Sequence, residues 1–142
     1  MACRSRERTE PVLAELKKFG AEAEFLELDL ADLSKAAAAG RAFAGDHASL
    51  DVLVNNAGLA AARGLTKDGY ELAFGTNHLG HFALVGHLLP LLRRTPGARV
   101  VVVSSGVHHG GRIDFDDLHF ERKGYSAWRA YAQSKLANLL FA

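Results

Sequence analysis

Short apolar runs separated by helical segments constrain the fold of this chain more than any other feature. The runs at 50–54 (LDVLV) and 98–105 (ARVVVVSS) are almost continuously apolar, and the second contains consecutive valines. β-Branched residues favour strands. Strands that are apolar on both faces are typical of parallel sheets covered by helices on both sides. The pattern therefore predicts an α/β fold.

The segments between these runs have the period of amphipathic helices. Helices are expected at 6–20, 32–45 and 67–94, and a last one begins near Ala127 or Trp128. A further strand is expected at 22–30, and a polar, glycine-rich loop at 106–126. Within 67–94, close packing against a neighbour and a kink are expected at Gly75, Gly80, Gly86 and Pro90. Helices that alternate with apolar strands predict a doubly wound parallel sheet.

Composition excludes several classes of protein. The net charge of +1 over 142 residues, without a basic cluster, gives no electrostatic footprint for nucleic acid. No apolar run reaches the roughly 18 residues that cross a bilayer, and the N-terminus lacks the apolar core of a signal peptide. The single cysteine, Cys3, cannot form an internal disulfide, so we expect a cytoplasmic protein.

Polar or small residues lie at or directly after the carboxyl ends of three expected strands. These residues are Asp29 in the first strand, Asn55, Asn56, Ala57 and Gly58 after the second, and Ser104 and Ser105 after the third. Ligands of open parallel sheets bind beyond the carboxyl ends of the strands, so we expect Asp29, Asn55, Asn56 and Ser105 to line one crevice. The alternative is that these polar residues only bring the strands to the surface.

Tyr131 and Lys135 lie four residues apart on the last expected helix and should share one face. An ammonium close to a phenol stabilises the phenolate, and a phenol tuned in this way is a useful general acid or base. Tyrosine and lysine also occur at this spacing by chance in many helices, so the pair alone carries little weight.

The histidines raise the question of a metal site. His78 and His81 lie three residues apart on an expected helix, and His108 and His109 are adjacent in the expected loop. Zinc usually takes three or four protein ligands in a recognisable arrangement. We therefore expect packing or loop histidines and no metal.

Four motifs, in order and at suitable spacing, resemble the short-chain dehydrogenase/reductase family. They are NNAG at 55–58, TNHLGHF at 76–82, VVVSS at 101–105 and YAQSK at 131–135. The resemblance covers essentially the whole chain, 1–142, as part of one domain. It looks strongest to the branch of retinol dehydrogenases and the WW-domain oxidoreductase, on NHLGHF, RIDFDDLHFERKGYS and SKLANLLF. It implies a Rossmann-like, doubly wound parallel sheet.

The resemblance also implies an oxidoreductase with a four-residue active site. Tyr131 would be the acid/base for the carbonyl or alcohol of a hydrophobic small molecule. Lys135 would stabilise the tyrosine phenolate and hold the nicotinamide ribose. Ser105 would bind the substrate oxygen, and Asn77 would hold a water in a proton relay with Lys135.

A cofactor cleft follows from the same resemblance. Asp29, with Leu30 beside it, would contact the adenine, and Asn55, Asn56, Ala57 and Gly58 would support the cleft. Arg4 lies where the family selects its cofactor, and an arginine there accommodates the extra phosphate of NADP, which makes NAD less favoured. Alternatively, Arg4 is a solvated charge near the N-terminus.

Two parts of the family pattern are not found in this sequence. The glycine-rich turn that would precede ACRSR and the strands that would follow the last helix are both lacking. Because the family's first strand lies at the centre of its sheet, the expected sheet is incomplete. The chain is then either part of an enzyme or an inactive, truncated remnant or interaction protein. Taken alone, it is expected to be inactive and poorly folded; self-association through the helices at 67–94 and 128–142 is also expected.

Overall fold

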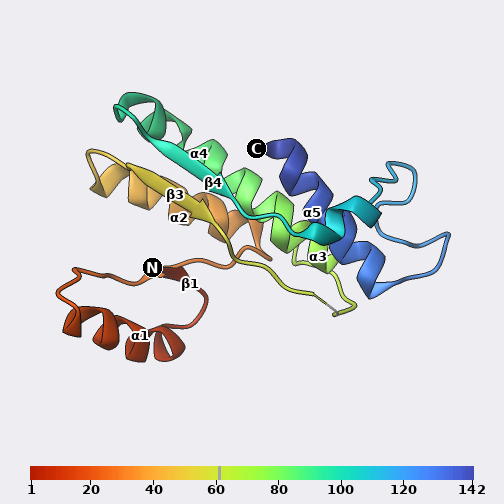
Figure 1. Cartoon of the computed structure of the whole chain (residues 1–142), viewed down its shortest axis with the longest axis horizontal. Coiled ribbons are helices and arrows are strands. Elements are labelled where there is room, and N and C mark those ends of the chain that lie inside the picture. Colours follow the sequence, from red (N-terminus) through yellow and green to blue (C-terminus); the bar gives the residue numbers. More distant parts are fainter. Residues whose placement is uncertain (61) are drawn as a thin grey trace.

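The structure, a computed structural model, describes residues 1–60 and 62–142 and alternates helices with parallel strands (Figure 1). The strands are β1 (Ala2–Cys3), β2 (Leu26–Glu27), β3 (Val52–Asn55) and β4 (Arg99–Val102). The helices are α1 (Arg6–Lys18), α2 (Leu33–Asp46), α3 (Leu72–Phe74), α4 (Gly80–Arg94) and α5 (Ala127–Phe141). A π-helical turn, η1 (Gly75–Leu79), and a 3₁₀ turn, η2 (Gly106–Gly110), complete the order. The predicted α/β class is confirmed.

The strands form two separate parallel pairs within the described residues. In one pair Ala2 lies opposite Leu26, and in the other the register runs from Val52 opposite Arg99 to Asn55 opposite Val102. Figure 1 shows β1 lying apart from β3 and β4. The sheet is therefore incomplete, as expected, and the break falls between β1 and β3.

The main core lies where α2 packs on α4. Its buried members are Leu28, Leu30, Ala36, Ala39, Leu84, Leu88 and Leu92, with Leu53 of β3 packed against them. Successive residues of a strand point to opposite faces, so Val52 and Val54 point away from this core. Their exposed fractions of 52% and 54% show that the predicted cover on both faces is wrong for this face of β3.

The single helix expected at 67–94 is divided into three parts. Regular structure begins at Leu72, because the buried carboxylate of Glu71 accepts hydrogen bonds from the N–H groups of Ala73 and Phe74 and so caps α3. The π-helical turn η1 then joins α3 to α4. Pro90 lies inside α4 without ending it.

Two of the three glycines in this stretch permit close packing, as predicted. A Cβ on Gly75 would lie 2.3 Å from Thr66 Cγ2, and one on Gly80 would lie 2.4 Å from the Leu30 carbonyl oxygen. A Cβ on Gly86 would meet nothing within 4 Å, so the prediction is wrong there. Gly80 thus fixes the start of α4 against the chain that follows β2.

The strand expected at 22–30 pairs only over Leu26–Glu27. The physical reason is that its partner β1 offers two residues, and a ladder is no longer than its shorter strand. After β2 the chain carries Leu28, and then Leu30 at the start of a turn, into the core.

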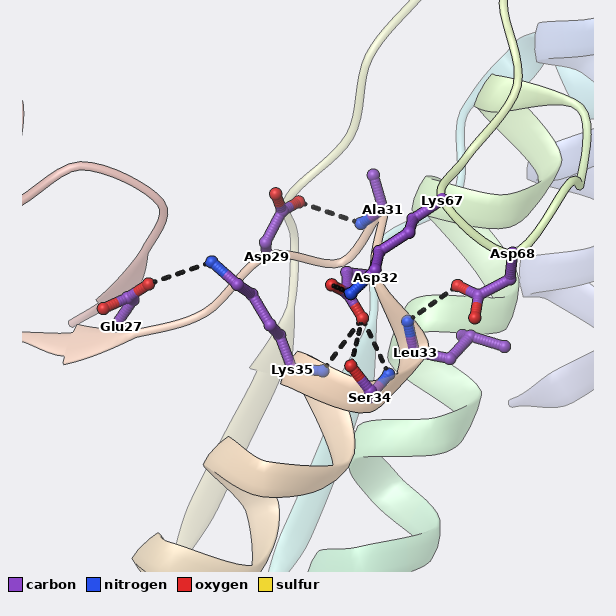
Figure 2. A network of polar contacts seen from close by, with 9 residues as sticks. All are labelled: Glu27, Asp29, Ala31, Asp32, Leu33, Ser34, Lys35, Lys67 and Asp68. Atoms are coloured by element: carbon purple, nitrogen blue, oxygen red, sulfur yellow. Dashed lines mark hydrogen bonds and ion pairs between the residues drawn. The ribbon is translucent and has the colours of Figure 1, made fainter.

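A polar network fastens the start of α2 (Figure 2). Asp32 Oδ1 accepts hydrogen bonds from the N–H groups of Ser34 and Lys35, and Lys67 Nζ lies 2.6 Å from Asp32 Oδ2. Asp68 accepts a hydrogen bond from the N–H of Leu33 at 2.9 Å. The Lys67 ammonium and the Ser34 hydroxyl hold the pKa of Asp32 well below its usual range. The network ties the loop before α3 to the helix that follows β2.

Candidate active site

A cavity of about 360 Å³ lies beyond the carboxyl ends of β3 and β4, against α5. It brings together three of the four predicted catalytic residues, Ser105, Tyr131 and Lys135. The remaining lining residues are Asn56, Gly58, Leu59, Ala60, Val103 and Ser104. The expectation that strand ends and the last helix meet at one site therefore holds for these residues.

Lys135 is buried on α5, with 4% of its surface exposed. Its Nζ donates a hydrogen bond to the Val103 carbonyl at 3.0 Å and lies 5.8 Å from the centre of the Tyr131 ring. Burial lowers the pKa of Lys135. Ser104 Oγ also donates to the Lys135 carbonyl at 2.7 Å, which fixes α5 to the end of β4. Tyr131 and Lys135 thus share one face, as the spacing predicted.

Asn77 is fully buried in the π-helical turn η1. Its Oδ1 accepts a hydrogen bond from the N–H of Leu59 at 2.8 Å, and its Nδ2 donates to the Leu59 carbonyl and to Ser134 Oγ at 2.9 and 3.0 Å. Its own carbonyl accepts a hydrogen bond from His81 Nδ1 at 2.9 Å. The side chain therefore joins the loop after β3 to η1 and α5, a role that the sequence did not indicate.

Gly58 lets this loop lie directly against the site. A Cβ there would be 3.2 Å from Asn77 Oδ1 and 3.6 Å from Lys135 Nζ. Gly58 and Leu59 also line a second cavity of about 230 Å³, which includes Arg4, Leu30 and Ala57 among its lining residues. The two cavities share Gly58 and Leu59. Together they are lined by eight of the predicted cofactor-binding or catalytic residues, namely Arg4, Leu30, Asn56, Ala57, Gly58, Ser105, Tyr131 and Lys135.

Two predicted cofactor residues line neither of these cavities. Asp29 Oδ1 accepts a hydrogen bond from the N–H of Ala31 at 3.0 Å. Asn55 is 1% exposed, and its side-chain amide has no hydrogen-bond partner among the described residues. Of the four residues expected to share one crevice, Asn56 and Ser105 line the same cavity, and Asp29 and Asn55 line neither of the two cavities. The adenine contact of Asp29 stays a prediction.

Sequence reasoning missed Leu59, Ser104 and Ser134 as parts of the site. Leu59 acts through its backbone groups, which leave no mark in the sequence. The adjacent serine in VVVSS and the serine inside YAQSK were visible, but only the fold shows that Ser104 and Ser134 bond the backbone of α5. Their positions inside two motifs were the available signal.

His78 and His81 are packing residues in the structure. His78 lies 3.3 Å from Asn138 Oδ1 through its Nδ1, and burial lowers the pKa of both histidines. Across 1–60 and 62–142, no group of three potential metal ligands gathers. None of the helices in the described part of the chain is both long and apolar enough to cross a membrane.

With this geometry in view, the comparisons with known proteins define the class. The family model described as short chain dehydrogenase matches residues 1–116, and this chain belongs to that family. Its sequence is 44% identical to a Streptomyces lividans protein named "Probable oxidoreductase" and 42% identical to human retinol dehydrogenase 11, each over 99% of this chain. These matches cover 48% and 45% of the two relatives, so the chain spans about half their length.

Solved structures agree with this assignment. A protein of Mycobacterium paratuberculosis matches with a TM-score of 0.82 and 46% identity, over 99% of this chain and 49% of that one. The complex of Pseudomonas aeruginosa RhlG with NADP matches with a TM-score of 0.74 and 27% identity, over 99% and 52%. The Rossmann-type fold and its incompleteness in this chain are thus confirmed.

Proposed function

We propose that this chain carries the catalytic part of an NADP-linked oxidoreductase that interconverts a carbonyl and an alcohol, with Tyr131 as the acid/base. The observation that carries the proposal is the cavity that Ser105, Tyr131 and Lys135 line together. The retinol dehydrogenase relatives add support, because their names describe the oxidation of a hydrophobic alcohol.

In the reductive direction the Tyr131 hydroxyl donates a proton to the carbonyl oxygen of the substrate. The Lys135 ammonium, held near the ring, stabilises the phenolate that remains. The Ser105 hydroxyl donates a hydrogen bond to the same oxygen and fixes its direction. Oxidation uses the same contacts with the proton moving back to Tyr131. A bound nicotinamide would supply or accept the hydride.

The residues present fit a dinucleotide along the two cavities. Gly58, which lines both, leaves space that a side chain would fill. Arg4, Leu30 and Ala57 would hold the adenosine end, and Lys135, with the Tyr131 ring beside it, would hold the nicotinamide ribose. Arg4 is exposed, so its guanidinium is free to pair with the extra phosphate of NADP.

A hydrophobic substrate is part of the proposal. Leu59, Ala60 and Val103 add apolar surface to the cavity that Ser105 and Tyr131 also line. Apolar walls with a few placed polar groups are typical of small-molecule sites. Such a wall would accept a long-chain or ring-bearing aldehyde, ketone or alcohol.

The test uses the chain extended to the length of its relatives. Tyr131→Phe should remove most carbonyl reduction with NADPH while leaving NADPH affinity nearly unchanged, whereas Lys135→Met should lower both. Tyr70→Phe, which makes the same substitution away from the cavity, is the matched control. Undiminished turnover in Tyr131→Phe would refute the role of the phenol.

Calorimetric titration with NADPH distinguishes the proposed function from the alternative of an inactive remnant or an interaction protein. The 142-residue chain alone is expected to show no NADPH binding by calorimetry, beside micromolar binding by the extended protein. Absence of both binding and turnover in the extended protein would favour an inactive remnant or an interaction protein.

Self-association through α4 and α5 stays a prediction. Phe82 and Leu89 on α4 and Leu140 on α5 are 57%, 46% and 71% exposed, and exposed apolar side chains are typical of such surfaces. Sedimentation of the parent and of a Phe82→Ser variant would test it.

A further inference from the structure

The five-residue turn η2 joins Ser105 at the end of β4 to the surface of α5. At its first end, the Ser105 carbonyl accepts two hydrogen bonds from one residue, from His108 N at 3.0 Å and from His108 Nδ1 at 2.6 Å. A carbonyl only accepts, so Nδ1 carries the hydrogen, and in a neutral ring Nε2 is the acceptor. His108 therefore holds the backbone of Ser105 through a specific tautomer.

At its other end, the turn lies directly on α5. A Cβ on Gly111 would be 2.6 Å from the Ala132 carbonyl oxygen and 3.0 Å from the His108 carbonyl oxygen. The N–H of Gly111 donates to that His108 carbonyl at 2.9 Å. These neighbours are backbone atoms that cannot swing aside. The end of the turn thus rests on the backbone of α5 at Ala132, the residue after Tyr131.

The Ser105 hydroxyl is held more weakly by its neighbours than the Ser105 carbonyl is. Among the described residues its Oγ accepts one long hydrogen bond, from the N–H of Val107 at 3.5 Å. The direction of the hydroxyl therefore depends on how the Ser105 backbone is held, and that backbone is held by His108.

We propose that η2 sets the position of the Ser105 hydroxyl relative to the Tyr131 hydroxyl, with His108 as a positioning residue for Ser105. The proposal rests on the proposed function. Ser105 directly precedes the turn, and the other end of the turn rests on the backbone of α5, the helix that carries Tyr131. A loosened turn therefore changes the placement of Ser105 relative to α5. Because a misplacement of about 1 Å can cost up to 10²-fold in rate, loss of the His108 bond should reduce kcat by roughly ten- to a hundredfold.

The kinetic experiment uses the extended protein and two substitutions at one position. His108→Leu removes the donor, and His108→Asn keeps an amide nitrogen close to the place of Nδ1. We expect His108→Leu to lower kcat with an unchanged Kd for NADPH, and His108→Asn to restore most of it. His109→Leu is the matched control, because it makes the same substitution at the exposed neighbouring histidine, whose ring lies tilted to that of His108 with the ring centres 4.1 Å apart. Equal kcat in His108→Leu and the parent would overturn the positioning role.

A second measurement does not depend on activity. Long-range ¹⁵N–¹H correlation spectra should show His108 with a protonated Nδ1, and an Nε2–H tautomer would overturn the inference directly. If the parent protein shows no turnover, the proposed function fails. Amide spectra of the variants then test separately whether His108 positions Ser105. In that case His108→Leu is expected to shift the amide resonances of both Ser105 and Tyr131, and His109→Leu is expected to leave them in place. Unshifted resonances in His108→Leu would refute the positioning role of His108.

Discussion

Replacing Asn77 with alanine tests whether the main role of this residue is to hold the loop after β3 against η1 and α5. The substitution removes three hydrogen bonds and leaves the N–H and the carbonyl of Leu59 without their partner. Ser134 keeps its bond to the Tyr131 carbonyl and loses only a donor to its oxygen. The cost therefore falls mainly on the two backbone groups of Leu59.

The magnitude follows from these two groups. A buried polar group left unpaired costs about 1–3 kcal/mol. Leu59 is only half-buried, so water recovers part of this cost. We expect Asn77→Ala to lower the free energy of unfolding by about 2–4 kcal/mol, a large fraction of the 5–15 kcal/mol typical of a domain.

Urea unfolding of the extended protein, followed by circular dichroism, measures this loss. Asn56→Ala is the control, because Asn56 is an exposed neighbour in the same loop and should change stability by less than about 0.5 kcal/mol. Equal urea midpoints for Asn77→Ala and the parent would refute the fastening role. An equal loss in both variants would show that the loop, and not the Asn77 contacts, is responsible.

Three further predictions concern the cofactor, the helix contact and acid stability. In the extended protein, Arg4→Asp should shift the ratio of kcat/KM from NADP toward NAD by roughly ten- to a hundredfold, and an unchanged ratio would make Arg4 a solvated charge. In α2, a Cβ on Gly40 would lie 2.8 Å from His87 Cβ, whereas Gly45 has open space. Gly40→Ala should therefore destabilise by about 1–3 kcal/mol in urea unfolding, and Gly45→Ala should stabilise by up to about 1 kcal/mol. Because the pKa of Asp32 is lowered in the folded protein, its contribution is present above the ordinary carboxyl pKa of 3.8 and is lost as pH falls below it. Asp32→Asn should thus flatten the decline of the urea midpoint as pH falls below about 4, and an unaltered decline there would contradict this.

The sequence predicted the parts of the fold that depend on periodicity. The consecutive valines of β4 and the spacing of Tyr131 and Lys135 led to a strand and a shared helix face, which the structure contains. The break at Glu71 and the π-helical turn were not predicted. The cap consists of side-chain bonds to the backbone, and a π-helical turn of five residues is too short for its shift of the apolar period to be read from the sequence. The role of Asn77 was also out of reach, since its partners are backbone groups of a residue 18 positions away.

The separation of the strand pairs has a consequence for hydrogen exchange along β3. Asp51 and Asn55 accept hydrogen bonds from the N–H groups of Arg99 and Val103 in and beside β4, so every second residue of β3 faces that partner. Val52 and Val54 then direct their amides to the opposite edge, which β1 does not pair within the described residues. Deuterium uptake should therefore be fast at Val52 and Val54 and slow at Leu53 between them. The amides of a single strand would report, residue by residue, on which side the sheet is open.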